Sequence, residues 1–197
     1  MKIDSDCSTL KLRPLANKPR RTFLRSFASA FAPMALSAPG LGGLASPAPA
    51  QAATNLKLGQ PAPNLTLRTL EGQQIRTQDL VGQLVILTFW ATWCEPCREE
   101  LPILSMFNER HKDAGVQVLG FSLDTPDALP KVQRVASSLS FPVGLLGSAY
   151  AGDYGRIWNL PVNFVIDRAG RLAYNGWDDK TPSWTMPHLH SVMDPLL

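Results

Sequence analysis

Apolar and polar positions alternate along the chain in a way that separates strands from helices. Residues 84–90 and 116–122 are continuous apolar runs rich in branched and aromatic side chains, which is typical of strands covered on both faces. Shorter apolar segments bounded by Gly, Pro or charged turns indicate further strands. The predicted strands are 65–68, 74–76, 84–90, 116–122, 141–143, 164–167 and 171–174. Helices are predicted from the cysteine at 94 to about His111, over 127–138 and 150–158, and from Pro187 onward, with a helical turn at 77–80.

The order of these elements predicts an α/β fold. Strand, helix and strand follow one another and a hairpin closes the series, so we expect a central mixed β-sheet flanked by helices. The segment 65–76 is expected to add a hairpin as an N-terminal extension. No glycine-rich phosphate loop of standard spacing is present in the sequence, so a nucleotide cofactor is not indicated.

Residues 1–52 predict an export signal rather than folded structure. Arg20 and Arg21 are followed by Thr-Phe-Leu-Arg, which resembles the twin-arginine export motif. A weakly apolar stretch broken by Pro and Gly comes next, and then a run of small residues. Cleavage after Ala50 or after Ala52 is compatible with this pattern, and residues 53–197 would remain as one domain. A transit peptide, a basic tail and an anchor are the alternatives.

Charge is unevenly divided between these two parts. Residues 1–52 hold seven Lys and Arg residues against two acids, which leaves 12 basic and 14 acidic residues in 53–197. The domain is therefore slightly acidic and has no basic stripe, so nucleic acid is not expected as a partner. Cys7 would be lost with the signal, and the two remaining cysteines are too few for a disulfide framework. Export would place them in the bacterial periplasm, which is kept oxidising.

Cys94 and Cys97 form a Cys-x-x-Cys motif between a predicted buried strand and a predicted helix. A sulfur at a helix N-terminus is stabilised as a thiolate by unpaired N–H groups and the helix dipole. Pro96 suits the first helical turn because its missing N–H needs no partner there. A structural disulfide or a metal pair is the alternative. Zinc would need more ligands than one such pair, and covalent haem would need His where Arg98 stands.

Three segments carry a resemblance to a known family. They are Phe89-Trp90-Ala91-Thr92-Trp93-Cys94-Glu95-Pro96-Cys97-Arg98-Glu99-Glu100-Leu101-Pro102, Val118-Leu119-Gly120-Phe121-Ser122-Leu123-Asp124, and Leu160-Pro161-Val162-Asn163-Phe164-Val165-Ile166-Asp167. The first looks like the active-site segment of the thioredoxin superfamily. Together they resemble the TlpA/ResA-type disulfide reductases over residues 56–176. The resemblance implies a thioredoxin-like fold and protein thiol–disulfide oxidoreductase activity.

The resemblance also implies roles for individual residues. Cys94, Cys97 and Glu100 would be catalytic, with Glu100 tuning the thiols from a partly buried position. Pro161 matches a cis-proline that faces the disulfide, and Leu160 matches a residue whose backbone pairs with substrate. The expected substrate-binding set is Trp93, Glu95, Pro96, Leu160 and Pro161. The departures from the family pattern are Thr88, where thioredoxins carry a buried acid, Asn163, where Thr or Ser is usual, and a Trp- and Pro-rich tail.

The expected reaction is dithiol–disulfide exchange on exported protein substrates, in the direction of reduction. It needs no metal or other cofactor beyond the Cys94–Cys97 disulfide. A membrane thiol reductant would recycle the enzyme, which is expected to be a monomer, and the resemblance suggests cysteines of apocytochromes or of metal sites as targets. A thiol peroxidase, a net disulfide oxidant and a binding module without activity are the alternatives.

Overall fold

The computed structural model describes residues 56–197. The predicted export signal, with Arg20, Arg21 and both candidate cleavage sites, lies outside the described residues. Among the described residues, no helix combines the length and the apolar character needed to cross a membrane.

Five strands form the central sheet in the order β5-β4-β3-β6-β7. They are β3 (Leu84–Trp90), β4 (Val116–Ser122), β5 (Val143–Leu145), β6 (Val162–Ile166) and β7 (Leu172–Asn175). β3, β4 and β5 run parallel, whereas β6 and β7 pair antiparallel, so the sheet is mixed as predicted. The segment after β3 and the segment before β6 therefore meet at one edge of the sheet, because Phe89 pairs with Val162.

The sheet buries both of its faces, and β3 shows how. Its even-numbered residues Leu84, Ile86 and Trp90 belong to one apolar cluster, and its odd-numbered residues belong to the other. This period of two follows from the alternation of side chains along a strand. The alternation places Thr88 on the even-numbered face, among apolar residues and fully buried.

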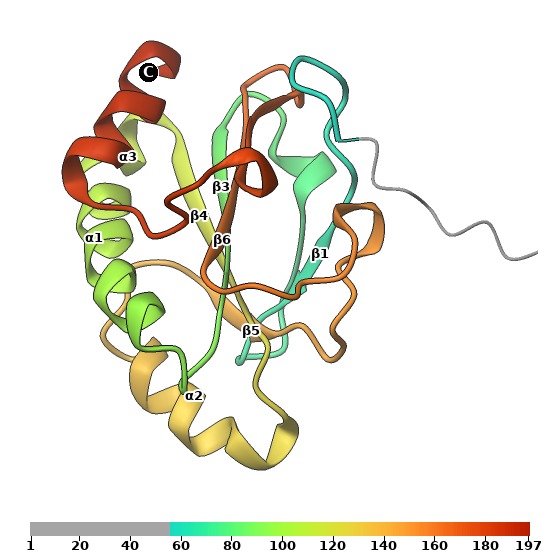
Figure 1. Ribbon diagram of the computed structural model, residues 1–197, viewed down its shortest axis with the longest axis vertical. Coiled ribbons are helices and arrows are strands. Elements are labelled where there is room, and N and C mark those ends of the chain that lie inside the picture. The colour runs from blue at the N-terminus through green and yellow to red at the C-terminus, as the bar shows by residue number, and fades with distance from the viewer. Residues whose placement is uncertain (1–55) are drawn as a thin grey trace, which may run out of the picture. The chain divides into compact units, whose positions relative to one another are not determined.

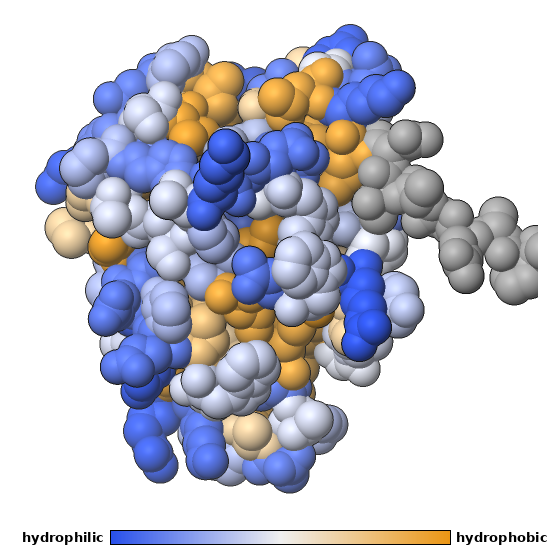
Figure 2. All heavy atoms as spheres, viewed as in Figure 1, coloured by the Kyte–Doolittle hydropathy of each residue, from blue (hydrophilic) through white to orange (hydrophobic). Residues whose placement is uncertain are grey.

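Two helices cover the even-numbered face of β3. They are α1 (Glu95–His111) and α3 (Met186–Met193), which lie side by side against the sheet (Figure 1). α2 (Leu129–Ala136) adds Val132 to the same cluster. The tail packs firmly: Trp184, Leu189 and Met193 are buried there. Hydrophilic residues dominate the left and lower parts of Figure 2, where α1 and α2 lie, and apolar residues show in the middle of the view.

The opposite face is covered by the predicted N-terminal hairpin, β1 (Thr66–Arg68) and β2 (Gln74–Arg76), seen beside the sheet in Figure 1. Leu67 is its buried anchor. A Cβ on Gly144 of β5 would collide with the carbonyl oxygen of Arg68, so the hairpin packs directly on the backbone of that strand. Gly176, after β7, is equally constrained, because a Cβ there would collide with the carbonyl oxygen of Asn163.

The predicted helix over 150–158 is wrong. The structure has only a 3-10 turn at Gly152–Tyr154, and Tyr150 pairs with Arg156 in an isolated β-bridge. Gly152 and Gly155 adopt positive φ angles of 55° and 86°, which a helix does not use. The short strand predicted at 141–143 instead begins at Val143, because Pro142 has no N–H to donate to a ladder.

Candidate active site

Cys94 is the residue immediately before α1 and caps its N-terminus. Its backbone is extended, with φ −88° and ψ 106°, and its sulfur accepts a hydrogen bond from the Cys97 N–H at 3.3 Å. Pro96 occupies the first turn, where the absent N–H leaves no gap in the helix. When the disulfide is reduced, the same N–H and the helix dipole would stabilise a thiolate on Cys94.

A disulfide joins Cys94 and Cys97, with an S–S distance of 2.01 Å and a Cα–Cα distance of 5.3 Å. Cys94 is 6% exposed and Cys97 is 1% exposed. Cys94 is therefore the more exposed residue of the pair, which favours it as the one that an approaching group reaches. The motif predicted this order, because its second cysteine lies one turn further into the helix.

The segment that delivers Cys94 is held by Asp124, which follows β4. Its carboxyl accepts hydrogen bonds from the backbone N–H of Thr92 at 2.8 Å and from the Thr92 hydroxyl at 2.6 Å. The hydroxyl of Ser122 donates to the same carboxyl at 2.8 Å. Asp124 is buried, so this arrangement anchors the residue two positions before Cys94. Sequence reasoning did not single out Asp124 for this role.

The residues flanking the disulfide in the chain face solvent. Trp93 is 70% exposed, and Glu95 and Pro96 are also exposed. An indole this exposed gains little from packing, so it is available for contact with another molecule. Trp90, by contrast, is fully buried in the core.

The Leu160–Pro161 peptide bond is cis, as the resemblance implied. Pro161 is buried, and Leu160 is half-buried, in contact with both apolar clusters. Both residues precede β6, whose first residue pairs with Phe89 near the end of β3. This register brings Leu160 and Pro161 to the same edge of the sheet as the segment that leads into Cys94.

Glu100 lies on the buried face of α1, one turn beyond Cys97, and is 2% exposed. Its Oε2 accepts the backbone N–H of Trp184 at 2.7 Å. Its Oε1 accepts Nδ2 of Asn163 at 2.8 Å and, more weakly, the Thr88 hydroxyl at 3.5 Å. Burial raises the pKa of Glu100 from its ordinary 4.5 to about 7, although each of these hydrogen bonds acts to lower it. A carboxyl with this pKa can gain and lose a proton near neutral pH.

Three partners of Glu100 come from distant parts of the chain. Thr88 and Asn163 are directly paired across β3 and β6, and Trp184 belongs to the tail. The three departures from the family pattern, at Thr88, at Asn163 and in the tail, thus lie together at one carboxyl. The Oδ1 of Asn163 has no hydrogen-bond partner among the described residues, although an unpaired buried acceptor costs about 1–3 kcal/mol.

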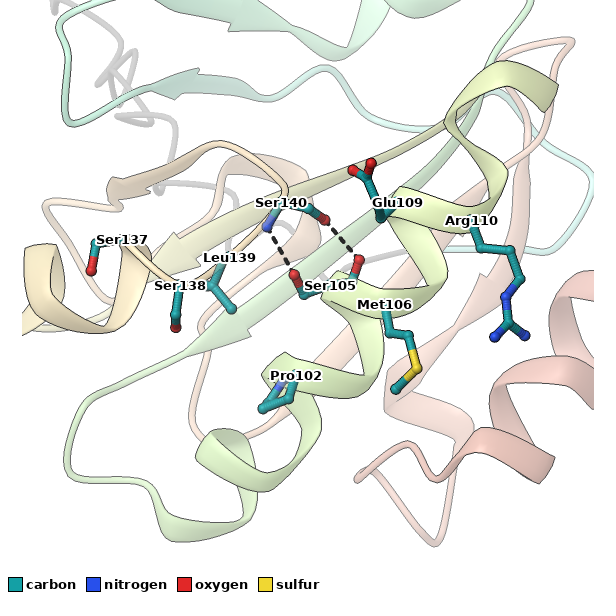
Figure 3. A pocket seen from close by; sticks show the side chains of 9 residues that line it. All are labelled: Pro102, Ser105, Met106, Glu109, Arg110, Ser137, Ser138, Leu139 and Ser140. Carbon is teal, nitrogen blue, oxygen red and sulfur yellow. Dashed lines mark hydrogen bonds between the residues drawn. The ribbon is translucent and has the colours of Figure 1, made fainter.

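A shallow hollow of about 740 Å³ lies away from the disulfide, between α1 and the segment after α2 (Figure 3). Met106 and Arg110 project from α1 beside it, and two hydrogen bonds join Ser105 to Ser140 across it. Neither cysteine lines it. Within residues 56–197, no group of three or more His, Cys, Asp or Glu side chains is placed to hold a metal ion.

The sheet order, the helix that starts at a Cys-x-x-Cys disulfide and the cis-proline define a thioredoxin-like protein thiol–disulfide oxidoreductase. Residues 58–175 match the AhpC/TSA family, and the chain belongs to that family.

Relatives of known name agree with this assignment. The chain is 36% identical to the thiol-disulfide oxidoreductase ResA of Bacillus thuringiensis (strain Al Hakam) over 119 residues, which are 60% of this chain and 68% of the relative. It is 28% identical to a Chlorobium tepidum protein assigned as a thiol:disulfide interchange protein DsbE, with a TM-score of 0.54 and coverage of 61% and 85% of the two chains. A Bacteroides thetaiotaomicron protein assigned as a protein disulfide isomerase is 26% identical, with a TM-score of 0.58 and coverage of 73% and 91%.

Proposed function

We propose that this chain is an exported protein disulfide reductase in which Cys94 attacks the substrate and Cys97 resolves the product. The assignment of roles rests on one observation. Cys94 caps α1 and is 6% exposed, whereas Cys97 lies one turn further into the helix and is 1% exposed. A sulfur in the first position is both reachable and stabilised as a thiolate. A sulfur in the second position is protected from solvent yet within bonding distance of the first.

The cycle conserves atoms and electrons. The Cys94 thiolate attacks one sulfur of a substrate disulfide, forms a mixed disulfide and releases the other substrate sulfur as a thiolate. The Cys97 thiolate then attacks the Cys94 sulfur and releases the second substrate thiolate. The substrate gains two electrons, and the enzyme ends as the Cys94–Cys97 disulfide. Electrons pass directly between sulfur atoms, so the proposed reaction requires no bound cofactor.

Glu100 would serve the second step. Cys97 must lose its proton before it can attack, and the Glu100 carboxyl lies one turn away on the same buried face of α1. Its pKa of about 7 lies between that of an ordinary carboxyl and that of a thiol, so the carboxyl can accept a proton from Cys97 and later release it.

Substrate would bind along the sheet edge that carries the disulfide. The exposed Trp93, Glu95 and Pro96 flank Cys94, and Leu160 and Pro161 reach the same edge from β6. An extended polypeptide can pair with the backbone of Leu160 while its cystine meets Cys94, in the manner of strand addition. This mode reads backbone more than side chains, so it suits a range of protein substrates.

The proposed cellular setting rests on the sequence of residues 1–52. A twin-arginine-like signal at Arg20 and Arg21 would export the chain to the periplasm, with cleavage near Ala50 or Ala52. That compartment is oxidising, so a membrane thiol reductant would have to return the disulfide to the dithiol state. Substrates would be exported proteins whose cysteines must be reduced before they bind haem or metal, and the enzyme would act as a monomer.

Trapping with Cys97→Ala tests the assignment of the two cysteines. The variant should accumulate a mixed disulfide through Cys94 with exported proteins, visible on non-reducing gels and released by a thiol reductant. The matched Cys94→Ala variant should trap nothing, because the remaining sulfur is 1% exposed. Equal adducts from both variants, or none from either, would overturn the proposed roles.

Two further measurements test the direction and the chemistry of the reaction. Equilibration with glutathione should show a disulfide more stable than that of a net oxidant. The reduced protein should consume hydrogen peroxide no faster than an ordinary thiol does. Rapid peroxide consumption would favour the thiol peroxidase instead.

A further inference from the structure

The two oxygens of the Glu100 carboxyl face chemically different partners. Oε2 accepts the backbone N–H of Trp184 at 2.7 Å. A backbone N–H can donate but never accept. Oε1 faces the side chains of Asn163 at 2.8 Å and Thr88 at 3.5 Å, and each of these side chains carries both a donor and an acceptor. Among the partners that residues 56–197 supply, an acceptor for the proton of neutral Glu100 therefore lies on the Oε1 side.

Asn163 has an unused acceptor at this place. The residue is 1% exposed, and its Oδ1 has no hydrogen-bond partner among the described residues. The terminal torsion of an asparagine is broad, so a half-turn exchanges Oδ1 and Nδ2. After that half-turn Oδ1 would face Oε1 and accept the O–H of a neutral carboxyl. Within the described part of the chain, Nδ2 makes one other hydrogen bond, to the Pro182 carbonyl, which is long at 3.4 Å and is easily given up.

We propose that Asn163 is a positioning residue for the proton of Glu100: its amide donates to the carboxylate, turns over, and accepts from the neutral acid at Oε1. The Trp184 N–H fixes Oε2 in both states, so the C-terminal tail confines the proton to one oxygen. The inference deepens the proposed function, in which Glu100 exchanges a proton with Cys97. It also gives the Trp- and Pro-rich tail a role that goes beyond covering the sheet.

The tail segment that supplies this N–H is held by polar contacts of its own. Tyr174 of β7 donates to Asp179, and Nε2 of His188 lies 3.3 Å from the Asp179 carboxyl. Trp184 donates from its indole to the Tyr174 oxygen at 3.4 Å. Of these groups, Tyr174 is the one that interacts electrostatically with Glu100. Burial raises the pKa of Tyr174, which therefore stays neutral across the range in which Glu100 titrates.

The direct test follows Glu100 and Asn163 together by nuclear magnetic resonance in the oxidised protein, whose disulfide cysteines do not titrate. The carboxyl carbon of Glu100 and the side-chain amide of Asn163 should shift with one common midpoint near pH 7. The amide shift should vanish in Glu100→Gln and persist in His188→Gln. An amide that stays constant while Glu100 titrates would overturn the inference, and so would an amide that still titrates in Glu100→Gln.

Two substitutions separate positioning from packing. Asn163→Thr keeps a group that donates and accepts, whereas Asn163→Leu has a similar size and does neither. The leucine variant loses a bond to both states of Glu100, and the charge-assisted bond to the carboxylate is the stronger of the two, so the variant should bind the Glu100 proton about tenfold more tightly. The threonine variant should stay near the wild-type midpoint. If both variants lose stability and neither midpoint moves, Asn163 has only a structural role.

The test of Asn163 can be interpreted independently of whether the proposed function is correct. The titrations need no substrate and no reduced cysteine, so they report on Asn163 even if the trapping experiment fails. Should the leucine variant not fold, the threonine variant and the wild-type amide titration still decide the matter.

Discussion

Thr92 is joined to Asp124 by two hydrogen bonds, one from its backbone N–H at 2.8 Å and one from its hydroxyl at 2.6 Å. The first residue precedes Cys94 by two positions, and the second follows β4, the strand next to β3. The bonds tie the segment that carries the reactive sulfur to the adjacent strand. The position of Cys94 therefore depends on the Asp124 carboxyl, which takes no part in the proposed thiol–disulfide exchange.

Asp124→Ala should weaken both the fold and the reaction. We expect the free energy of unfolding to fall by about 2 kcal/mol, since hydrogen bonds to a buried carboxyl are lost. The rate of insulin disulfide reduction should fall several-fold, because the segment before Cys94 is no longer held. Denaturant unfolding and the insulin assay measure the two effects. Asp127→Ala, at an exposed acid three residues further on, is the control, and equal effects of the two variants would contradict the prediction.

Glu100 should make the stability of the protein fall as the pH rises. Its pKa of about 7 in the folded state lies above the ordinary 4.5, so between these values the folded protein holds a proton that the unfolded chain has released. The contribution is complete below about pH 4.5 and is lost by about pH 7. Relative to Glu100→Gln, the wild type should lose about 3 kcal/mol across this window. Urea unfolding at several pH values checks this, and parallel curves for the two proteins would refute it.

Trp93→Ala should impair substrate binding without harming the fold. The side chain is 70% exposed, so its removal should change the free energy of unfolding by less than about 0.5 kcal/mol. If Trp93 contacts substrate, kcat/KM for a protein disulfide should fall about tenfold, which is a common cost for removing an aromatic contact. Met106→Ala removes another exposed apolar side chain, on the part of α1 beside the Figure 3 hollow, and should leave kcat/KM unchanged. Equal losses in both variants would remove the special role of Trp93.

Replacing Arg20 and Arg21 together by lysine should block export. The substitution keeps the charge and removes the guanidinium pair, so a signal read only by its charge would still function. Cell fractionation and the size of the processed chain give the readout. Arg13→Lys, outside the paired arginines, is the control and should be exported normally. Normal export of the double variant would point to another kind of signal.

Local patterns in the sequence were sufficient for much of the fold. The apolar runs at 84–90 and 116–122 became β3 and β4, and the helix that starts at the cysteines became α1. The helix predicted over 150–158 is wrong because Tyr154 and Ile157 are both buried and lie three residues apart, a spacing that is also typical of the buried face of a helix. Gly152 and Gly155, which have positive φ angles, turn the chain here instead. Spacing alone does not distinguish these cases.

Part of the candidate site could likewise be predicted from the local sequence, and part could not. The Cys-x-x-Cys motif places both sulfurs within one turn of a helix, so its geometry is local and could be predicted. The surroundings of Glu100 could not be predicted, because they join residues that lie 12, 63 and 84 positions away from it. Thr88 and Asn163 were visible only as departures from a family pattern. Their shared purpose depends on the pairing of β3 with β6 and on the path of the tail.

Gly176 links two of these distant pieces. Since any Cβ there would strike the backbone of Asn163, the chain leaving β7 is pressed against the strand that holds this asparagine. A glycine after β7 and an asparagine two residues after the cis-proline are thus parts of one arrangement. In related sequences, the joint presence of the two would identify members that handle the buried proton as this protein does, and a bulky residue at the glycine position would mark those with a differently routed tail.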